Sequence, residues 1–329
     1  MLPDFAYVRV DSLKQAIEEI SSPGARLHAG GTDLLGCLRD GVLGATKLVS
    51  VTRLRDLHGI RETADEARIG ALTTIFEIEG SSLIRERYAA LAQAASEVAS
   101  PQLRHQGTIG GNICQKPRCW YYRGDFRCLR KGGDTCYALQ GENQYHCIFG
   151  GDRCYMVHPS DIAPALLALN ARARIVGPQG EREVPMEGFH LLPHVSLERE
   201  TVLGTGEILT EILLPKPEEG LRSSYRKVRA RGSWDFALAG VALAMTLKGD
   251  LVGQSRVVLS GAAPVPWRAK AVEEAVNGRA LNSETVGRGA DAVVKDAEPL
   301  EHNQYKIPLF QGVMKEALEG IGRGTTSTR

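Results

Sequence analysis

The sequence has no apolar run long enough to cross a lipid bilayer. Its longest apolar stretch, Ala237 to Leu247, covers 11 residues, whereas a membrane-spanning helix needs about 20. No apolar run precedes Asp11 either, so we expect neither a signal peptide nor an anchor at the N-terminus. These absences predict a cytoplasmic chain with no membrane span, or a periplasmic one if a signal-bearing partner carries it across the membrane.

An excess of charge of either sign is also missing. Lys and Arg together number 40 and Asp and Glu 39, which gives a formal net charge of +1. Proteins that bind nucleic acid or anionic membranes carry basic surfaces, so we expect neither partner. The hydrophobic content of 43% is that of a globular protein, and 329 residues are enough for two domains.

Three common motifs of cofactor and metal sites are absent. Without a Gly-x-Gly-x-x-Gly segment, a Rossmann-type nicotinamide site has no support. Without a Cys-x-x-Cys pair, a zinc ribbon or finger is disfavoured. No histidine is paired with a carboxylate in a recognisable motif, so we expect no catalytic side chain on this chain.

Two glycine segments are present instead. Ala29-Gly30-Gly31-Thr32-Asp33 and Thr108-Ile109-Gly110-Gly111-Asn112 lie about eighty residues apart. Each one alone is compatible with a plain turn between a strand and a helix. Backbone N–H groups in such turns also cradle phosphates, and a ligand with two phosphates would need both segments. The pair therefore favours a dinucleotide.

A hydroxyl and a carboxylate follow in Ser160-Asp161, at the start of an apolar helical segment. They are suited to bonding a ribose or ribityl chain, and equally suited to capping that helix. Both interpretations stay open from the residues alone.

Six of the seven cysteines lie between Cys114 and Cys154. With no export signal, metal ligation is favoured over disulfides. Soft thiolate ligands at irregular spacing are typical of an iron–sulfur cluster, with zinc as the alternative. A cubane cluster needs four ligands, so at least two of the six are spectators, and Cys37 is expected to be a buried apolar residue. Basic side chains interleave with these cysteines, either to offset thiolate charge or as a solvated face.

The expected elements alternate between strands and helices. Strands are predicted at 5–10, 26–29, 46–51 and 67–72, and helices at 13–20 and 88–98. The segment Lys216 to Gly220 is the best linker in the sequence. We therefore expect a domain boundary near Pro217.

Four ordered motifs give the sequence a family resemblance. They are Ala-Gly-Gly-Thr-Asp-Leu at 29–34, Ser-Pro-Gln-Leu-Arg at 100–104, Thr-Ile-Gly-Gly-Asn at 108–112 and Ser-Asp-Ile-Ala-Pro-Ala-Leu at 160–166. Together they resemble the FAD-binding medium subunit of the xanthine dehydrogenase family of molybdenum hydroxylases. The resemblance extends to Tyr225-Arg226-Lys227-Val228 and covers nearly the whole chain.

The resemblance implies an α+β fold. A two-lobed, vanillyl-alcohol-oxidase-like FAD-binding domain would occupy residues 1–216, and a smaller domain with an antiparallel sheet and helices would occupy 217–329. Asp161 would then bond the ribityl or ribose hydroxyls, and Lys227 would approach the flavin. The implied FAD-binding residues are Leu27, His28, Ala29, Gly30, Gly31, Thr32, Asp33, Leu34, Thr108, Gly110, Gly111, Asn112, Ser160, Asp161 and Lys227.

An insertion at about 114–157 departs from ordinary members of that family, in which Gly-Gly-Asn-Ile and Ser-Asp are close together. It resembles the insertion in two branches, 4-hydroxybenzoyl-CoA reductase and the periplasmic aldehyde oxidoreductases, whose flavin subunit carries an additional [4Fe-4S] cluster. The cysteine spacing is closer to the aldehyde oxidoreductase pattern. The ligands that this implies are Cys119, Cys128, Cys136 and Cys154, with Cys114 and Cys147 in reserve.

The chain is thus expected to be the electron-transfer subunit of a three-subunit molybdenum hydroxylase, with FAD and a [4Fe-4S] cluster. The implied partners are a large molybdopterin-binding subunit and a small subunit with two [2Fe-2S] clusters, in a heterotrimer or a dimer of heterotrimers. A zinc-bearing docking module and a free-standing FAD oxidase are the alternatives. The substrate, the external electron acceptor and the direction of electron flow stay open, because their determinants lie mostly on partner chains.

Overall fold

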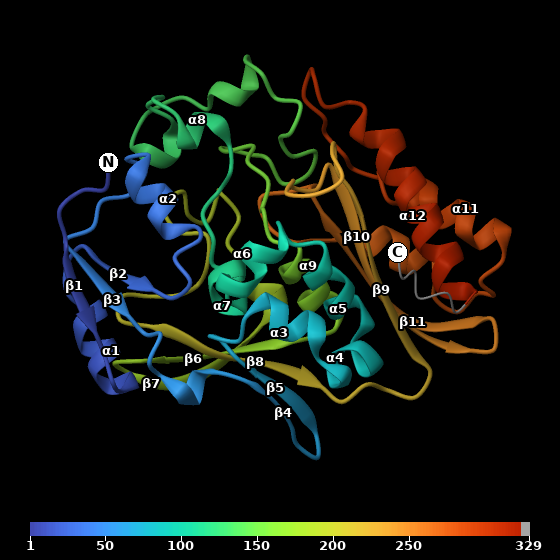
Figure 1. The fold of residues 1–329 in the computed structure, drawn as a ribbon. Coiled ribbons are helices and arrows are strands. Elements are labelled where there is room, and N and C mark those ends of the chain that lie inside the picture. The colour runs from blue at the N-terminus through green and yellow to red at the C-terminus, as the bar shows by residue number, and fades with distance from the viewer. Residues whose placement is uncertain (324–329) are drawn as a thin grey trace.

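The computed structural model describes residues 1–323, so the last six residues of the expected second domain lie outside the described residues. Figure 1 shows three sheets that follow one another along the chain, with most of the helices between and beside them. No helix of the described chain is long and apolar enough to cross a membrane. The mixture of strands and helices agrees with the expected α+β class.

The first sheet is small and parallel. Its strands are β1 (Ala6–Arg9), β3 (Lys47–Ser50) and β2 (Ala25–His28), in that order, with helices α1 (Leu13–Ile20) and α2 (Leu34–Arg39) in the connections. The side chain of Ser12 accepts a hydrogen bond from the N–H of Gln15 and so caps α1, as its sequence predicts. A small core that includes Val10, Ala16 and Val49 holds this unit together.

The second sheet is antiparallel, with strand order β4-β5-β8-β6-β7. The central strand β8 is buried along seven of its eight residues, so both of its faces are covered. The strands are β4 (Ile60–Glu62), β5 (Glu66–Gly70), β6 (Arg172–Gly177), β7 (Gly180–Pro185) and β8 (Ile208–Pro215). Helices pack against one another and this sheet, as Figure 1 shows: α3 (Ile75–Gly80), α4 (Ser82–Arg87), α5 (Ala89–Ser96), α6 (Pro101–Gln106), α7 (Ile109–Ile113) and α9 (Ile162–Ala168).

The third sheet is antiparallel and begins after the predicted linker at 216–220. Its strand order is β12-β11-β10-β9. Successive side chains along β10 point to opposite faces of the sheet and pack into two different hydrophobic cores. Val241 and Leu243 face the C-terminal helices, whereas Ala242 and Ala244 belong to the core with α5 and α9. The elements are β9 (Leu221–Val228), β10 (Ala239–Lys248), β11 (Leu251–Ser260), β12 (Trp267–Arg268), α10 (Lys270–Val276), α11 (Ser283–Ala292) and α12 (Lys306–Gly322).

The cysteine-rich insertion contains almost no regular structure. Between α7 and α9 the chain forms only α8 (Trp120–Arg123) and two single turns of 3-10 helix, η2 (Leu129–Lys131) and η3 (Tyr137–Leu139). Two more such turns, η1 (Arg55–Leu57) and η4 (Met186–Gly188), lie elsewhere. Figure 1 shows the insertion, in green, between the first sheet with α2 and the C-terminal α12. It therefore contacts parts of the chain far from it in sequence.

The core of the C-terminal part gives a first prediction. Phe310 of α12 is fully buried against the third sheet, so Phe310→Ala should lower the free energy of unfolding by about 3–5 kcal/mol, through lost apolar contact and an unfilled cavity. Leu251→Ala, at a position that is 49% exposed, is the control and should stay within about 0.5 kcal/mol of wild type. Urea denaturation of the purified chain measures both, and equal effects would contradict the assigned core.

Candidate functional site

The first glycine loop, between β2 and α2, is shaped by two glycines. Gly31 has a φ of +72°, in the left-handed region that glycine adopts freely. At Gly30 a Cβ atom would lie 1.9 Å from the carbonyl oxygen of Gln106, so only glycine allows the loop to approach the end of α6. Within residues 1–323, the N–H groups of Gly30, Gly31, Thr32 and Asp33 donate to no other group. They are therefore available to an anionic ligand.

The second glycine segment is the beginning of α7 and differs from the first. The Oγ1 atom of Thr108 accepts from the N–H of Gly111 at 3.2 Å and caps the helix. The N–H groups of Ile109 and Gly110 donate to backbone carbonyl oxygens of the β5–α3 connection, at 2.9 and 3.0 Å. Because these donors are already bonded, the segment contributes the shape of the site and few free N–H groups.

Two cavities begin at these glycine segments. The loop cavity has a volume of about 290 Å³ and is lined by residues 29–34 together with Leu27, Thr108, Gly110 and Gly111. The central cavity, of about 480 Å³, is lined by Thr32, Asp33, Gly111, Asn112 and Asp161 and by the aromatic rings of Trp234 and Phe236. Since Thr32, Asp33 and Gly111 line both cavities, the two adjoin.

Three of the predicted FAD-binding residues line neither cavity. His28 packs its ring against Tyr7, at 5.9 Å between centroids. The Ser160 hydroxyl donates to Asn112 Oδ1 at 2.5 Å and accepts from the N–H of Ala163 at 2.9 Å, so it joins the second glycine segment to α9. Direct contact of His28 or Ser160 with a flavin stays a prediction, as it does for Lys227.

Lys227 instead forms an ion pair with Asp161, which lines the central cavity. Its Nζ atom lies 2.8 Å from Asp161 Oδ2, while the hydroxyl of Tyr225 donates to Asp161 Oδ1 at 2.7 Å. The Lys227 and Asp161 side chains are only 1% and 5% exposed. Lys227 also donates to the carbonyl oxygens of Glu97 and Asp235, at 3.1 and 2.9 Å. This buried ion pair joins β9 to the start of α9.

The four cysteines predicted as cluster ligands line one cavity, the cysteine cavity. Its wall includes Cys119, Cys128, Cys136 and Cys154, whereas Cys114 lines the loop cavity and Cys147 is buried elsewhere. In the described part of the chain, no three His, Cys, Asp or Glu side chains converge as ligands of a single metal ion. The cysteine cavity is small, about 20 Å³, and its four thiols line it without converging on one point.

Burial governs the protonation of these thiols. It raises the pKa of Cys119 to about 12 and that of Cys154 to about 11, although the Arg130 guanidinium partly opposes the increase at Cys154. Without a metal, both groups are therefore thiols at neutral pH. A metal that binds them must displace two protons.

Carboxylates from outside the insertion hold it in place. Asp33 accepts from the backbone N–H of Lys116 at 2.7 Å and pairs with the guanidinium groups of Arg118 and Arg123 at 2.9 and 2.7 Å. Glu200 pairs with Lys116 and with Arg130, whose side chain is only 2% exposed. Of the two interpretations of the basic residues, a solvated face is wrong for Arg123 and Arg130, whose side chains are only 14% and 2% exposed, whereas the exposed Arg127 agrees with it.

A fourth cavity connects the two candidate cofactor sites. The bridging cavity has a volume of about 470 Å³ and is lined by Cys119, Trp120, His146, Arg118, Phe236 and eleven other residues. It shares Arg118 and Phe236 with the central cavity, and Cys119 and His146 with the cysteine cavity. The loop, central, bridging and cysteine cavities therefore form one series.

Sequence reasoning missed several residues of this series. Glu200, His146 and Phe236 carry no local motif, and their roles depend on contacts across 27 to 118 positions. Tyr225 belongs to the family motif at 225–228, but its bond to Asp161 was not predicted. Arg118 was noticed only as one of several basic residues. The sequence contains one signal for these contacts, the many Arg and Lys residues among the cysteines. If such residues are buried, they need acidic partners elsewhere in the chain.

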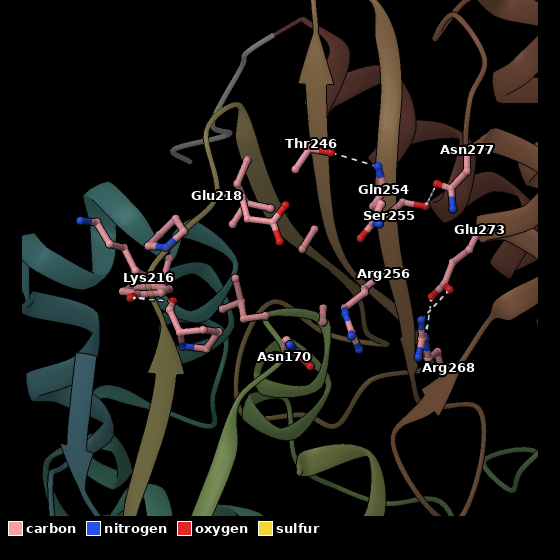
Figure 2. Close-up of a pocket in the computed structure, with 17 residues that line it drawn as sticks. Asn170, Lys216, Glu218, Thr246, Gln254, Ser255, Arg256, Arg268, Glu273 and Asn277 are labelled. Carbon is pink, nitrogen blue, oxygen red and sulfur yellow. Dashed lines mark hydrogen bonds and ion pairs between the residues drawn. The ribbon is translucent and has the colours of Figure 1, made fainter. Parts of the chain in front are cut away.

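A separate junction cavity, of about 430 Å³, contains none of the predicted site residues. Figure 2 shows it between the end of β8, the Asn170 turn and the third sheet. On one side Arg268 makes a two-atom contact with Glu273, at 2.9 Å for each bond. We assign it no part in the cofactor sites.

Comparisons with known proteins agree with this geometry. A family model described as the FAD binding domain in molybdopterin dehydrogenase matches residues 3–217, and one described as the CO dehydrogenase flavoprotein C-terminal domain matches residues 223–321. The chain is 34% identical over 320 residues to the aldehyde oxidoreductase FAD-binding subunit PaoB of Escherichia coli K12, with 95% of this chain and 97% of that protein covered.

Similarity to carbon monoxide dehydrogenase is found in both sequence and structure. The chain is 29% identical over 323 residues to the medium chain from Hydrogenophaga pseudoflava, covering 96% of each protein. A solved structure of carbon monoxide dehydrogenase from that organism, which lacks the Mo-pyranopterin moiety, superposes with a TM-score of 0.78. That match covers 98% of both chains at 29% identity.

The first glycine loop offers a direct test with a matched control. Gly30→Ala should sharply reduce the flavin content of the purified chain, because the added Cβ collides with the Gln106 carbonyl oxygen and displaces the loop. Gly36→Ala, six residues on, meets nothing within 4 Å and should leave the flavin content unchanged. Flavin absorbance per chain measures both, and a fully loaded Gly30→Ala protein would contradict the site.

The buried ion pair gives a stability prediction. Lys227→Met leaves the Asp161 carboxylate without its cation and should lower the free energy of unfolding by about 3–5 kcal/mol. The double variant Lys227→Met/Asp161→Asn should be less destabilised than the sum of the single variants, because no charge is left unpaired. Additive effects in urea denaturation would show that the two side chains are not coupled.

Proposed function

The chain belongs to the family of FAD-binding subunits of molybdopterin dehydrogenases, and we propose that it belongs to the branch that also carries a [4Fe-4S] cluster. Membership makes it an oxidoreductase subunit of a molybdenum hydroxylase complex, like its dehydrogenase and oxidoreductase relatives. One observation above all supports the cluster: four thiols chosen from the sequence line a single cavity. That cavity belongs to the same series as the cavities at the glycine loops.

For FAD, the residues fit the chemistry of a dinucleotide. Four free N–H groups at residues 30–33 suit a diphosphate, and the loop and central cavities adjoin at this loop. Asp161 is held in the central cavity by Tyr225 and Lys227, so its carboxylate is oriented before any ligand binds. When bound, FAD would supply the exchange between two-electron and one-electron chemistry.

For the cluster, the donor set favours iron–sulfur over zinc. Four soft thiols around a volume suit a cubane, in which each cysteine binds a different iron. A structural zinc ion needs its four ligands at about 2.3 Å from one point, and no three described side chains approach such a point. We therefore propose Cys119, Cys128, Cys136 and Cys154 as the cluster ligands, with Cys114 and Cys147 as spectators.

The order of the cavities supports an electron-transfer role. Residues 118 and 119 lie between the central cavity and the cysteine cavity, so both cofactors would be held by neighbouring parts of one chain. We propose that substrate chemistry, on an aldehyde or an aromatic or heterocyclic compound, takes place on a large molybdopterin-binding partner. A small partner with two [2Fe-2S] clusters would connect that site to this chain.

The broader organisation is proposed on the same basis. We propose a two-lobed, vanillyl-alcohol-oxidase-like FAD-binding domain at 1–216 and a smaller domain at 217–329, in a heterotrimer or a dimer of heterotrimers. The family models on either side of residues 218–222 support this division. We propose a cytoplasmic location, or a periplasmic one if a partner carries the signal for export.

The cysteines provide the decisive experiment. The purified chain should show flavin bands over a broad iron–sulfur shoulder, with four iron and four sulfide per chain. Cys119→Ser, Cys128→Ser, Cys136→Ser and Cys154→Ser should each lose most of the iron and sulfide, whereas Cys114→Ser and Cys147→Ser should keep both.

Metal analysis also separates the alternatives. Zinc without iron in the wild-type chain would support a docking module instead. Iron and sulfide that survive in Cys119→Ser would show that the ligand set is wrong. Substrate turnover by the chain alone would support a free-standing oxidase.

A further inference from the structure

His146 contacts one of the proposed cluster ligands. Its Nε2 atom lies 3.3 Å from the Sγ atom of Cys119, within the range of an N–H···S hydrogen bond. His146 is only 3% exposed and is the one histidine in the wall of the cysteine cavity. The family motifs do not include this residue.

The surrounding structure fixes the position of the His146 ring. Its backbone carbonyl oxygen accepts from Asn303 Nδ2 at 3.0 Å, and its N–H donates to the Asn143 carbonyl oxygen at 2.9 Å. The rings of Trp120 and Tyr121 lie 5.6 and 6.0 Å from it between centroids. The contact with Cys119 is therefore held by three segments of the chain.

The second ring nitrogen indicates where the proton lies. Nδ1 is buried and has no hydrogen-bond partner among the described residues. Once Cys119 is a thiolate it can only accept a hydrogen bond, so a proton on Nδ1 would be an unsatisfied buried donor and the bare Nε2 lone pair would face a negative sulfur. A proton on Nε2 instead gives a favourable hydrogen bond, most of all when Cys119 is a thiolate.

The Cys119–His146 pair lies between the bridging cavity and the cysteine cavity. Cys119 and His146 are the two residues that line both the bridging cavity and the cysteine cavity. The hydrogen bond thus lies on the side of the cysteine cavity that faces the flavin site. The other three proposed ligands do not line the bridging cavity.

We propose that His146 is a positioning residue that donates an Nε2–H···Sγ hydrogen bond to the Cys119 thiolate and raises the reduction potential of the cluster. This inference rests on the proposed function. A hydrogen bond to a ligand sulfur stabilises the more negative, reduced state, so its loss lowers the potential. No proton is transferred, because the N–H stays on His146 in both states.

The test measures the cluster potential in the full chain by redox titration followed by electron paramagnetic resonance. His146→Phe keeps a ring but removes the donor, and should shift the reduction equilibrium about tenfold toward the oxidised state, which is about 59 mV for a one-electron couple. His146→Gln restores an N–H donor and should lie closer to wild type. The exposed His58 provides the control His58→Phe, which should have the wild-type potential.

The outcomes separate this inference from the proposed function. A wild-type chain without iron and sulfide would overturn both. A loaded His146→Phe protein with the wild-type potential would overturn the inference alone. If His146→Phe does not hold a cluster, electron spin echo spectroscopy of the wild-type chain with ¹⁵N-labelled histidine decides. A histidine nitrogen coupled to the reduced cluster supports the hydrogen bond, and no coupling overturns it.

Discussion

The carboxylate of Asp33 is the constraint on which both candidate cofactor sites depend. Asp33 is the last residue of the first glycine loop, whose N–H groups are free within residues 1–323. Its carboxylate binds the beginning of the cysteine insertion through Arg118, Arg123 and the Lys116 N–H. The side chain is about one-sixth exposed, at 16%, so these charge-assisted bonds are only partly screened by water. A displacement of the glycine loop would therefore also displace the segment that leads to Cys119, and the two sites are coupled mechanically.

The Asp161–Lys227 pair fixes the opposite wall of the central cavity. It joins α9 to β9, while Phe236 on the loop after β9 lies 5.3 Å from the Arg118 guanidinium. The third sheet is thus connected to the cavity from two directions, once through a buried ion pair and once through a cation–π contact. The central cavity is therefore lined by segments that follow strands of all three sheets.

Local patterns in the sequence predicted some features of this arrangement, and long-range contacts determined the others. The strands near residues 6, 25 and 47 and the Ser12 cap were predicted, because periodicity and capping are local features of the sequence. The four cysteines that line one cavity were selected from six by the family resemblance. The bonded N–H groups of Ile109 and Gly110 were not predicted, since their acceptors belong to the β5–α3 connection. Glu200 was missed for the same reason: its partners lie 70 and 84 residues earlier.

The distribution of charge around the cysteine cavity follows from these contacts. Arg118 and Arg123 pair with Asp33, and Arg130 and Lys116 pair with Glu200. Four cations face two carboxylates, so positive charge remains for nearby thiolates, and Arg130 lowers the pKa of Cys154 against the effect of burial. Lys306 is different: it is fully buried, donates to the Gly261 carbonyl oxygen at 2.7 Å, and has no carboxylate partner among residues 1–323. Burial lowers its pKa to about 8, while the nearby Cys147 opposes that decrease. A buried ammonium without a counter-charge is costly, and the lowered pKa means that the neutral amine of Lys306 becomes accessible only slightly above neutral pH.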